Sequence, residues 1–208
     1  MKSKVSYTDI FRATWKSLIS QCWLLMGLII GFTIIYSLLL LFTIPSKGET
    51  ISISGIIVSV LCLFLFGLFV MGFLKNCLQT LDKEEPQFSA YGQVSQKLLG
   101  FIAAYLLYSV IIIAGLALFI FPGIYLALRL QFFYASMVDE DTGLLESFKR
   151  SWDITKGQAK PLFVLSLIQL LVCLSGIVVF IIGIFVAIPL MVLMYSYTYR
   201  KLTAPATE

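Results

Sequence analysis

Long apolar runs dominate this chain and restrict what it can fold into. A transmembrane helix needs about 20 consecutive, mostly apolar residues. Six stretches of the 208-residue sequence approach or exceed that length, at about 22–44, 52–75, 97–120, 122–138, 161–180 and 182–200. Hydrophobic residues make up 60% of the chain and charged residues 12%, against roughly 45–50% and 25% in soluble domains. This excess of apolar surface predicts an all-α, polytopic membrane helical bundle.

Turn signals divide the longest apolar stretches. Phe121-Pro122-Gly123 separates the third run from the fourth, and proline and glycine together favour a tight turn. The fifth and sixth runs form one stretch of about 40 residues, which as a single helix would be about 60 Å long, twice the hydrocarbon thickness. The chain must therefore turn back, and Gly183 is the expected place. We expect six transmembrane helices as three hairpins, in one transmembrane domain comprising residues 1–208.

The distribution of basic residues predicts the orientation. Of the 15 Lys and Arg residues, 13 lie in the N-terminal segment, around 75–97, around 149–160, or at Arg200-Lys201. Basic residues concentrate in cytoplasmic loops of membrane proteins. With six spans, both the N- and the C-terminus are expected in the cytosol. The opposite side then carries only short loops, which excludes an outer catalytic domain.

Two segments on the expected cytosolic side, at about 6–20 and 142–156, have aromatic residues on one helical face and charged residues on the other. This pattern is typical of short amphipathic interfacial helices; the alternative is a plain extension of the neighbouring spans. The residues expected to contact the membrane surface are Phe11, Trp15, Lys16, Phe148, Lys149, Arg150 and Trp152. Phe88 and Tyr91 precede the middle hairpin in a similar way, which suggests a unit of interfacial helix and hairpin used three times.

Arg129 is the one basic residue that lies away from the ends of a predicted span, near the bilayer midplane. A charge there costs at least about 2.5–3.5 kcal/mol and is commonly paired. No acidic residue lies inside a predicted span, so the candidate partners are Asp139 or Glu140, helix carbonyls, Gln169, Ser166, or a bound anionic lipid or solute. Two interpretations stay open: Arg129 and Gln169 form a lipid or anion site, or Arg129 is locked between helices by carbonyls and Gln169.

The sequence carries few groups for catalysis. It has no His, its four Cys form no CxxC pair, and it lacks the glycine-rich phosphate and dinucleotide motifs. We therefore expect no catalytic residue, no cofactor and no metal site. Asp139-Glu140-Asp141 could bind a divalent cation, but helix capping and ion pairing are the favoured interpretation. The basic residues flank membrane spans, so they indicate lipid contact and no nucleic-acid partner.

The stretch from Pro122-Gly123 through Arg129 and Asp139-Glu140 to Lys156-Gly157 contains a proline–glycine turn, a helix with one Arg, an acidic pair and an amphipathic helix. It resembles a bacterial six-helix family of unknown function that includes YciC-like inner-membrane proteins and the membrane domain of some glycerophosphodiester phosphodiesterases. The resemblance implies the architecture and a bacterial cytoplasmic (inner) membrane. It does not imply the phosphodiesterase activity, because this sequence has no such domain.

Three functions are compatible with these patterns. The leading prediction is a non-enzymatic integral membrane protein that binds lipid, including anionic lipid, or a protein partner, which includes a second copy of itself. The alternative is a transporter or permeation protein with a polar pocket at Arg129. The third is an intramembrane lipid-modifying enzyme, which would need the carboxylates of residues 139–141 to converge with others from separate helices.

Overall fold

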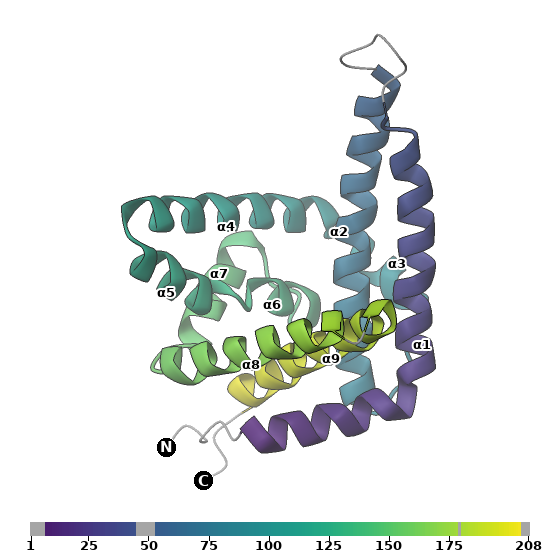
Figure 1. Cartoon of the computed structure of the whole chain (residues 1–208). Helices are drawn as coiled ribbons and strands as arrows, with labels where there is room; N and C mark the ends of the chain where they lie inside the picture. The colour runs from purple at the N-terminus through teal and green to yellow at the C-terminus, as the bar shows by residue number, and fades with distance from the viewer. Residues whose placement is uncertain (1–6, 45–52, 179, 205–208) are drawn as a thin grey trace.

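The computed structural model describes residues 7–44, 53–178 and 180–204, and within these ranges every regular element is an α-helix (Figure 1). Residues 6 and 52, which begin two of the predicted segments, lie outside the described ranges. The helices are α1 (Tyr7–Leu41), α2 (Ile53–Leu81), α3 (Ser89–Ser95), α4 (Leu98–Leu118), α5 (Ile120–Leu130), α6 (Phe133–Asp139), α7 (Leu144–Ile154), α8 (Ala159–Val178) and α9 (Phe180–Thr203). The prediction of an all-α protein is confirmed.

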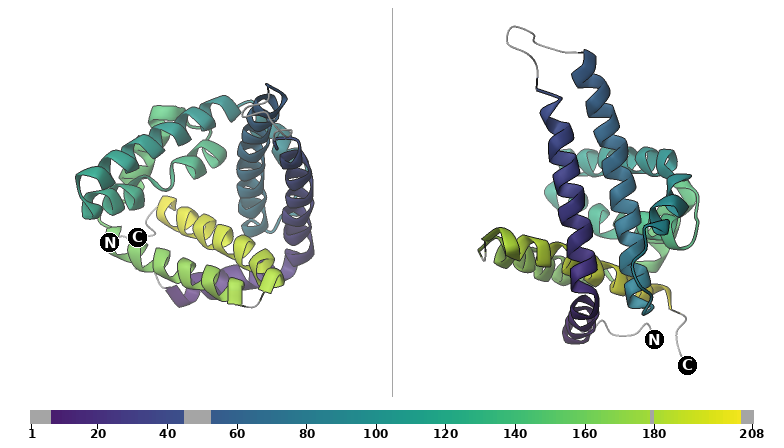
Figure 2. Two further views of the ribbon diagram at one scale, coloured as in Figure 1. Left: turned by 45° about the horizontal axis from the view of Figure 1, so that its top comes forward. Right: turned by 90° about the vertical axis from the view of Figure 1, so that its right-hand side faces the viewer.

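Helix α9 is the central element of the fold. It packs against α1, α2 and α8, which lie around it in Figure 2. Leu193, Met194 and Tyr199 on α9 are fully buried. They contribute to two hydrophobic clusters, one with α1, α2 and α8 and the other with α2, α4 and α6. The last apolar run of the sequence is therefore largely a core helix.

The longer helices do not run parallel to one another. The second half of α1 and helix α2 stand side by side, whereas α4, α8 and α9 cross them steeply (Figures 1 and 2). This arrangement differs from the bundle of near-parallel spans that the apolar runs suggested. Helix α9 packs across α1 and α2, and α8 packs against α9 as a pair. Both helices therefore cross α1 and α2 and do not run alongside them.

Four described helices, α1, α2, α4 and α8, are long and apolar enough to cross a membrane, so the prediction of six spans is corrected to four candidates. The predicted span 122–138 is broken into α5 and α6, and the 11 residues of α5 extend only about 17 Å. The predicted span 182–200 lies in α9, which does not meet the same criterion over its described residues. The arrangement as three membrane hairpins stays a prediction.

Helix α1 bends at Gln21, whose φ of −133° and ψ of 25° lie outside the helical range. The bend falls between the segments predicted at 6–20 and 22–44. It separates a first half that carries Arg12 and Lys16 from a second half that is almost wholly apolar. The location of the first half on the membrane surface stays a prediction, as does that of α7.

Glycine pairs allow α4 to approach α5, and α8 to approach α9, very closely. A Cβ added at Gly115 would lie 3.0 Å from the Cα of Gly123. A Cβ added at Gly176 would lie 2.9 Å from the carbonyl oxygen of Gly183. The first helix of each pair ends before the second glycine, since α4 is followed by the extended Phe119, and α8 ends at Val178 with α9 beginning at Phe180. The predicted turns at Pro122-Gly123 and Gly183 are thus displaced, because both glycines serve helix packing.

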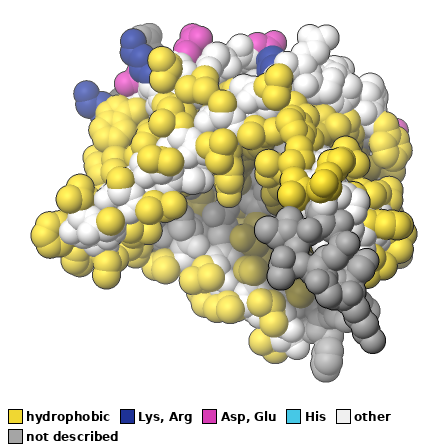
Figure 3. Space-filling model, turned by 90° about the horizontal axis from the view of Figure 1, so that it is seen from above, with side chains coloured by type: hydrophobic (Ala, Val, Ile, Leu, Met, Phe, Trp, Pro, Cys, Tyr) yellow, Lys and Arg dark blue, Asp and Glu magenta, His cyan; other side chains and the backbone are white. Residues whose placement is uncertain are grey.

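The surface of the described residues is unusually apolar. Large hydrophobic side chains are exposed along α1, α2, α4 and α8, for example Trp23 at 88% and Leu171 at 65%. Figure 3 shows hydrophobic side chains spread over one face, with charged side chains gathered along one edge. Monomeric soluble proteins rarely expose apolar patches of this size, so this surface is that of a membrane-embedded protein.

Candidate functional site

The break between α5 and α6 is stabilised by hydroxyl groups from α7. Ser151 Oγ donates to the carbonyl oxygen of Arg129 at 2.9 Å and accepts from the N–H of Phe132 at 3.1 Å. Thr155 Oγ1 lies 3.0 Å from the same carbonyl oxygen. Both hydroxyl residues are fully buried. Unpaired backbone groups are costly away from water, so the partners that α7 supplies stabilise the interruption of the helix here.

Two further contacts hold the same break. The hydroxyl of Tyr195 on α9 donates to the carbonyl oxygen of Gln131 at 2.8 Å. The Gln131 side-chain amide donates back to the carbonyl of Leu128 at 3.1 Å. Helices α7 and α9 therefore fix the interrupted segment from two sides. The sequence signal for this role was the spacing of four residues between Ser151 and Thr155, which the pattern of aromatic and charged faces did not reveal.

Arg129 lies directly at this break and is almost completely enclosed, with 3% of its surface exposed. Its guanidinium carbon lies 4.2 Å from the centroid of the Trp152 ring and 5.9 Å from that of Tyr125. Its Nε has no hydrogen-bond partner, and no described carboxylate lies within ion-pair distance. A desolvated cation–π contact contributes about 2 kcal/mol, so stacking on Trp152 offsets much of the cost of the buried charge.

Gln169, the other residue of the predicted anion site, serves a different contact. Its side-chain amide on α8 donates to the carbonyl oxygen of Met191 on α9 at 3.2 Å. Within the described chain no hydrogen bond joins Gln169 to Arg129. The structure thus places Gln169 in the α8–α9 packing, whereas Arg129 is held by α7.

The three successive carboxylates at the end of α6 face basic residues from separate elements. Glu140 accepts two hydrogen bonds from the Arg150 guanidinium, at 2.7 and 2.8 Å. These bonds hold the pKa of Glu140 below its ordinary value. Asp141 forms an ion pair with Lys97, which also donates to the carbonyl of Met137 at 3.3 Å.

Asp139 belongs to a second ionic cluster centred on Arg200. The Arg200 guanidinium lies 2.7 Å from an oxygen of Asp82 and 3.2 Å from one of Asp139. Burial raises the pKa of Asp139 above its ordinary value, and the nearby Arg200 opposes that shift. Among the residues that the structure describes, no group of three His, Cys, Asp or Glu side chains could hold a metal ion. Ion pairing is therefore the observed role of this acidic segment.

A polar pocket of about 660 Å³ opens beside this cluster, at the bend of α1. It is enclosed by the first half of α1, the end of α2 and the end of α9, and its lining comprises Ala13, Lys16, Ser17, Ser20, Gln21, Thr80, Leu81, Asp82, Lys83, Tyr197 and Arg200. Three of these side chains are cationic and one is a carboxylate. Arg200 is bound to Asp82, whereas Lys16 and Lys83 form no ion pair with a described carboxylate. The pocket therefore presents excess positive charge to a ligand.

The residues predicted to contact the membrane surface are distributed over different environments. Phe11 and Trp15 are stacked, with ring centroids 6.0 Å apart, and both are about 40% exposed. They lie on the same half of α1 as Lys16, which lines the polar pocket. These three residues remain available to a membrane surface.

The residues of the second predicted surface segment mostly contact protein. Phe148 stacks on the buried Phe133 at 5.0 Å, and Trp152 stacks on Arg129. Arg150 binds Glu140, whereas Lys149 is exposed and Trp152 keeps 39% of its surface exposed. Helix α7 thus packs its predicted contact residues against α5 and α6 to a greater extent than the amphipathic pattern suggested.

Comparison with known proteins places these features in a family without an assigned activity. The family described as "Domain of unknown function (DUF7847)" matches residues 44–207. The chain is 28% identical over 159 residues to the uncharacterized protein Rv2560 of Mycobacterium tuberculosis and to the uncharacterized protein Mb2590 of Mycobacterium bovis. Each match covers 76% of this chain and 47% of the relative, so the chain spans about half the length of these relatives. No solved structure matches the chain.

Proposed function

Since the chain belongs to the DUF7847 family, whose function is unknown, we propose from its structure that it is a non-enzymatic integral membrane protein that binds anionic lipid. The polar pocket at the bend of α1 receives the headgroup. The observation that carries this proposal is the pair of lysines, Lys16 and Lys83, that face the pocket without a described carboxylate partner.

The position of the pocket supports a lipid headgroup as its ligand. It lies where the charged half of α1 meets the apolar half, which is where a membrane surface would meet the hydrocarbon. Hydroxyl groups of Ser17, Ser20 and Tyr197 stand beside the lysines and can bind phosphate or glycerol oxygens. Phe11 and Trp15, on the same half of α1, would lie at headgroup depth.

The pocket is a better headgroup site than Arg129, the residue that the sequence favoured. Arg129 is enclosed by protein and stacked on Trp152, and it lines none of the three cavities described in this structure. With 3% of its surface exposed, Arg129 is poorly accessible to an anion. We therefore assign Arg129 to the stability of the broken helix. Transport past Arg129 would need a cavity that reaches it.

The proposal also includes the more specific predictions made from the sequence. They are a bacterial cytoplasmic membrane, both termini in the cytosol, kinship with the YciC-like proteins, and association with a protein partner or a second copy. The first described residue of α1 and the last of α9 lie at the same end of the molecule (Figure 1). This is compatible with termini on one side of the membrane.

The test is native mass spectrometry of the protein released from nanodiscs that contain equal amounts of phosphatidylglycerol and phosphatidylcholine. We expect the wild type to retain phosphatidylglycerol preferentially. A basic residue near an anionic surface contributes about 1 kcal/mol, or about fivefold in binding. The double substitution Lys16→Gln/Lys83→Gln should therefore weaken retention about 25-fold.

The matched control is Lys149→Gln, which removes an exposed lysine of α7 that does not line the pocket. It should retain phosphatidylglycerol as the wild type does. Equal retention of the two lipids by the wild type would contradict the proposal. So would a Lys16→Gln/Lys83→Gln protein that retains as much phosphatidylglycerol as the Lys149→Gln protein.

A further inference from the structure

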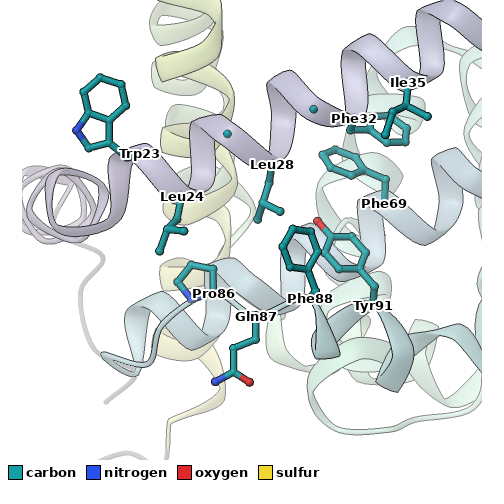
Figure 4. Close-up of a pocket in the computed structure, with 12 residues that line it drawn as sticks. Trp23, Leu24, Leu28, Phe32, Ile35, Phe69, Pro86, Gln87, Phe88 and Tyr91 are labelled. Atoms are coloured by element: carbon teal, nitrogen blue, oxygen red, sulfur yellow. The ribbon is translucent and has the colours of Figure 1, made fainter.

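A second cavity, of about 540 Å³, lies on the other side of the bend in α1 (Figure 4). It is a groove between the second half of α1, helix α2 and the 86–91 segment that leads into α3. Its lining is mostly apolar and comprises Trp23, Leu24, Gly27, Leu28, Gly31, Phe32, Ile35, Phe69, Pro86, Gln87, Phe88 and Tyr91. Unlike the polar pocket, it has no charged side chain in its lining.

Two glycines keep this groove open. A Cβ added at Gly27 or at Gly31 would meet no atom within 4 Å, in contrast to Gly115 and Gly123, which are closely packed. Glycine four residues apart in a membrane helix commonly allows another group to approach the backbone. Since no described part of the chain occupies that space, these glycines provide room for something outside the chain.

The groove and the polar pocket are neighbours. Ser17, Ser20 and Gln21 on α1 line the pocket, and Trp23 and Leu24, directly after the bend, line the groove. The walls that face α1 are also close in sequence, because Asp82 and Lys83 line the pocket and residues 86–88 line the groove.

A hydrogen bond from Gln21 lies between the two cavities. The Gln21 side-chain amide donates to the carbonyl oxygen of Glu84 at 2.9 Å, and Gln21 is half-buried whereas Glu84 is exposed. This bond links the bend of α1 to the segment that follows α2. One cavity is therefore cationic and the next one apolar, and this contact lies where they meet.

We propose that the pocket and the groove together bind one diacyl phospholipid, with its anionic headgroup in the pocket and one acyl chain in the groove. This inference rests on the proposed function and adds the second half of the ligand. The order of the charges along α1 selects an amphiphile, because excess positive charge lies at one end and uncharged aromatic walls at the other. From Leu24 to Ile35, α1 rises about 17 Å, close to the about 15 Å of one leaflet's hydrocarbon layer.

The walls of the groove are suited to hold a chain in a defined place. Phe32 and Phe69 stack with ring centroids 3.8 Å apart, and Tyr91 packs against Phe69 at 6.3 Å. Because lipid and the groove are both apolar, the hydrophobic effect does not favour the groove, and van der Waals packing must hold the acyl chain there. The groove therefore acts through its shape, and filling it with a larger side chain should expel the acyl chain.

The experiment compares Gly27→Leu and Gly31→Leu with Gly92→Leu in the phosphatidylglycerol nanodisc assay. At all three positions an added Cβ meets nothing within 4 Å, but Gly92 does not line the groove. Leucine is a better helix former than glycine, so each variant should fold, and circular dichroism verifies this. We expect the groove variants to retain about tenfold less dioleoyl phosphatidylglycerol, and Gly92→Leu to retain as much as the wild type.

A short-chain lipid separates the groove from the pocket. Dihexanoyl phosphatidylglycerol has the same headgroup with chains too short to fill the groove, so Gly27→Leu should bind it as the wild type does. Undiminished dioleoyl lipid on Gly27→Leu would overturn the acyl-chain site while leaving the headgroup site intact. Conversion of a dimer to a monomer by Gly27→Leu, with lipid retention unchanged, would also overturn it and assign the groove to a second copy. If the wild type retains no phosphatidylglycerol of either length, the proposed function itself fails.

Discussion

Replacing Ser151 with alanine should expose how much the broken helix depends on α7. The Ser151 hydroxyl serves two backbone groups, since it donates to the carbonyl of Arg129 and accepts from the N–H of Phe132. After Ser151→Ala, the Arg129 carbonyl keeps Thr155 as a partner, but the buried Phe132 N–H has none. Leaving one buried donor unsatisfied costs about 1–3 kcal/mol.

Thermal unfolding in detergent measures this cost. For chains of 150–250 residues, 1 kcal/mol corresponds to roughly 2–4 °C in Tm, so Ser151→Ala should lower Tm by about 2–12 °C. Hydrogen exchange provides a local readout, because the Phe132 amide should exchange faster. The matched control is Thr155→Val, which removes the other hydroxyl but leaves the Arg129 carbonyl bonded to Ser151. Its cost should be about 0.5–1 kcal/mol, or about 1–4 °C.

The ranking of these two variants tests the reasoning. If Thr155→Val destabilises the protein as much as Ser151→Ala, the unsatisfied Phe132 N–H is not the main cost. If Ser151→Ala leaves both Tm and the exchange of the Phe132 amide unchanged, α7 does not hold the break through this hydroxyl. Either result would refute the account of why α5 and α6 are separate helices.

Two further perturbations test the polar cluster and the glycine packing. Arg150 lowers the pKa of Glu140, so the stabilising contribution of this ion pair is complete above the ordinary value of about 4.3 and declines as the pH falls through the lower folded-state value. Glu140→Gln should therefore lower Tm by about 0.5–4 °C at pH 7, and its difference from the wild type should vanish in acid. A difference in Tm that does not depend on pH would contradict this. A Cβ at Gly123 would lie 2.8 Å from the backbone N of Leu116, so Gly123→Leu should cost about 1–3 kcal/mol in thermal unfolding; equal Tm values for Gly123→Leu and Gly27→Leu would count against this close packing.

The positions of the apolar helices could be read from the sequence. The runs at 22–44, 52–75, 97–120 and 161–180 correspond to the second half of α1 and to α2, α4 and α8 within a few residues, α2 alone continuing further, to Leu81. Uninterrupted apolar sequence favours helix in or beside a membrane, because the backbone hydrogen bonds are then satisfied within the segment. The bend at Gln21 also coincides with the change from mixed to apolar composition. These features depend on local sequence alone.

The role of Arg129 could not be read in this way. The sequence correctly indicated that this residue was exceptional, since it is a charge within an apolar run. Its partner is an aromatic ring, Trp152, which the amphipathic pattern of 142–156 had assigned to the membrane surface. Cation–π contacts leave no charge pattern in the sequence that would reveal them before the packing of α7 against α5 is known.

By itself, the sequence determined the helical class, the location of the long apolar segments and the presence of one charge that needs special surroundings. Only the tertiary structure decided that the fourth run is two short helices and the sixth largely a core helix. It also decided which basic residues share a pocket, because Lys16, Lys83 and Arg200 come from α1, the segment after α2 and α9. The physical reason is that hydropathy measures a residue's preference for apolar surroundings. Both lipid and the protein interior satisfy that preference, and only long-range packing distinguishes them.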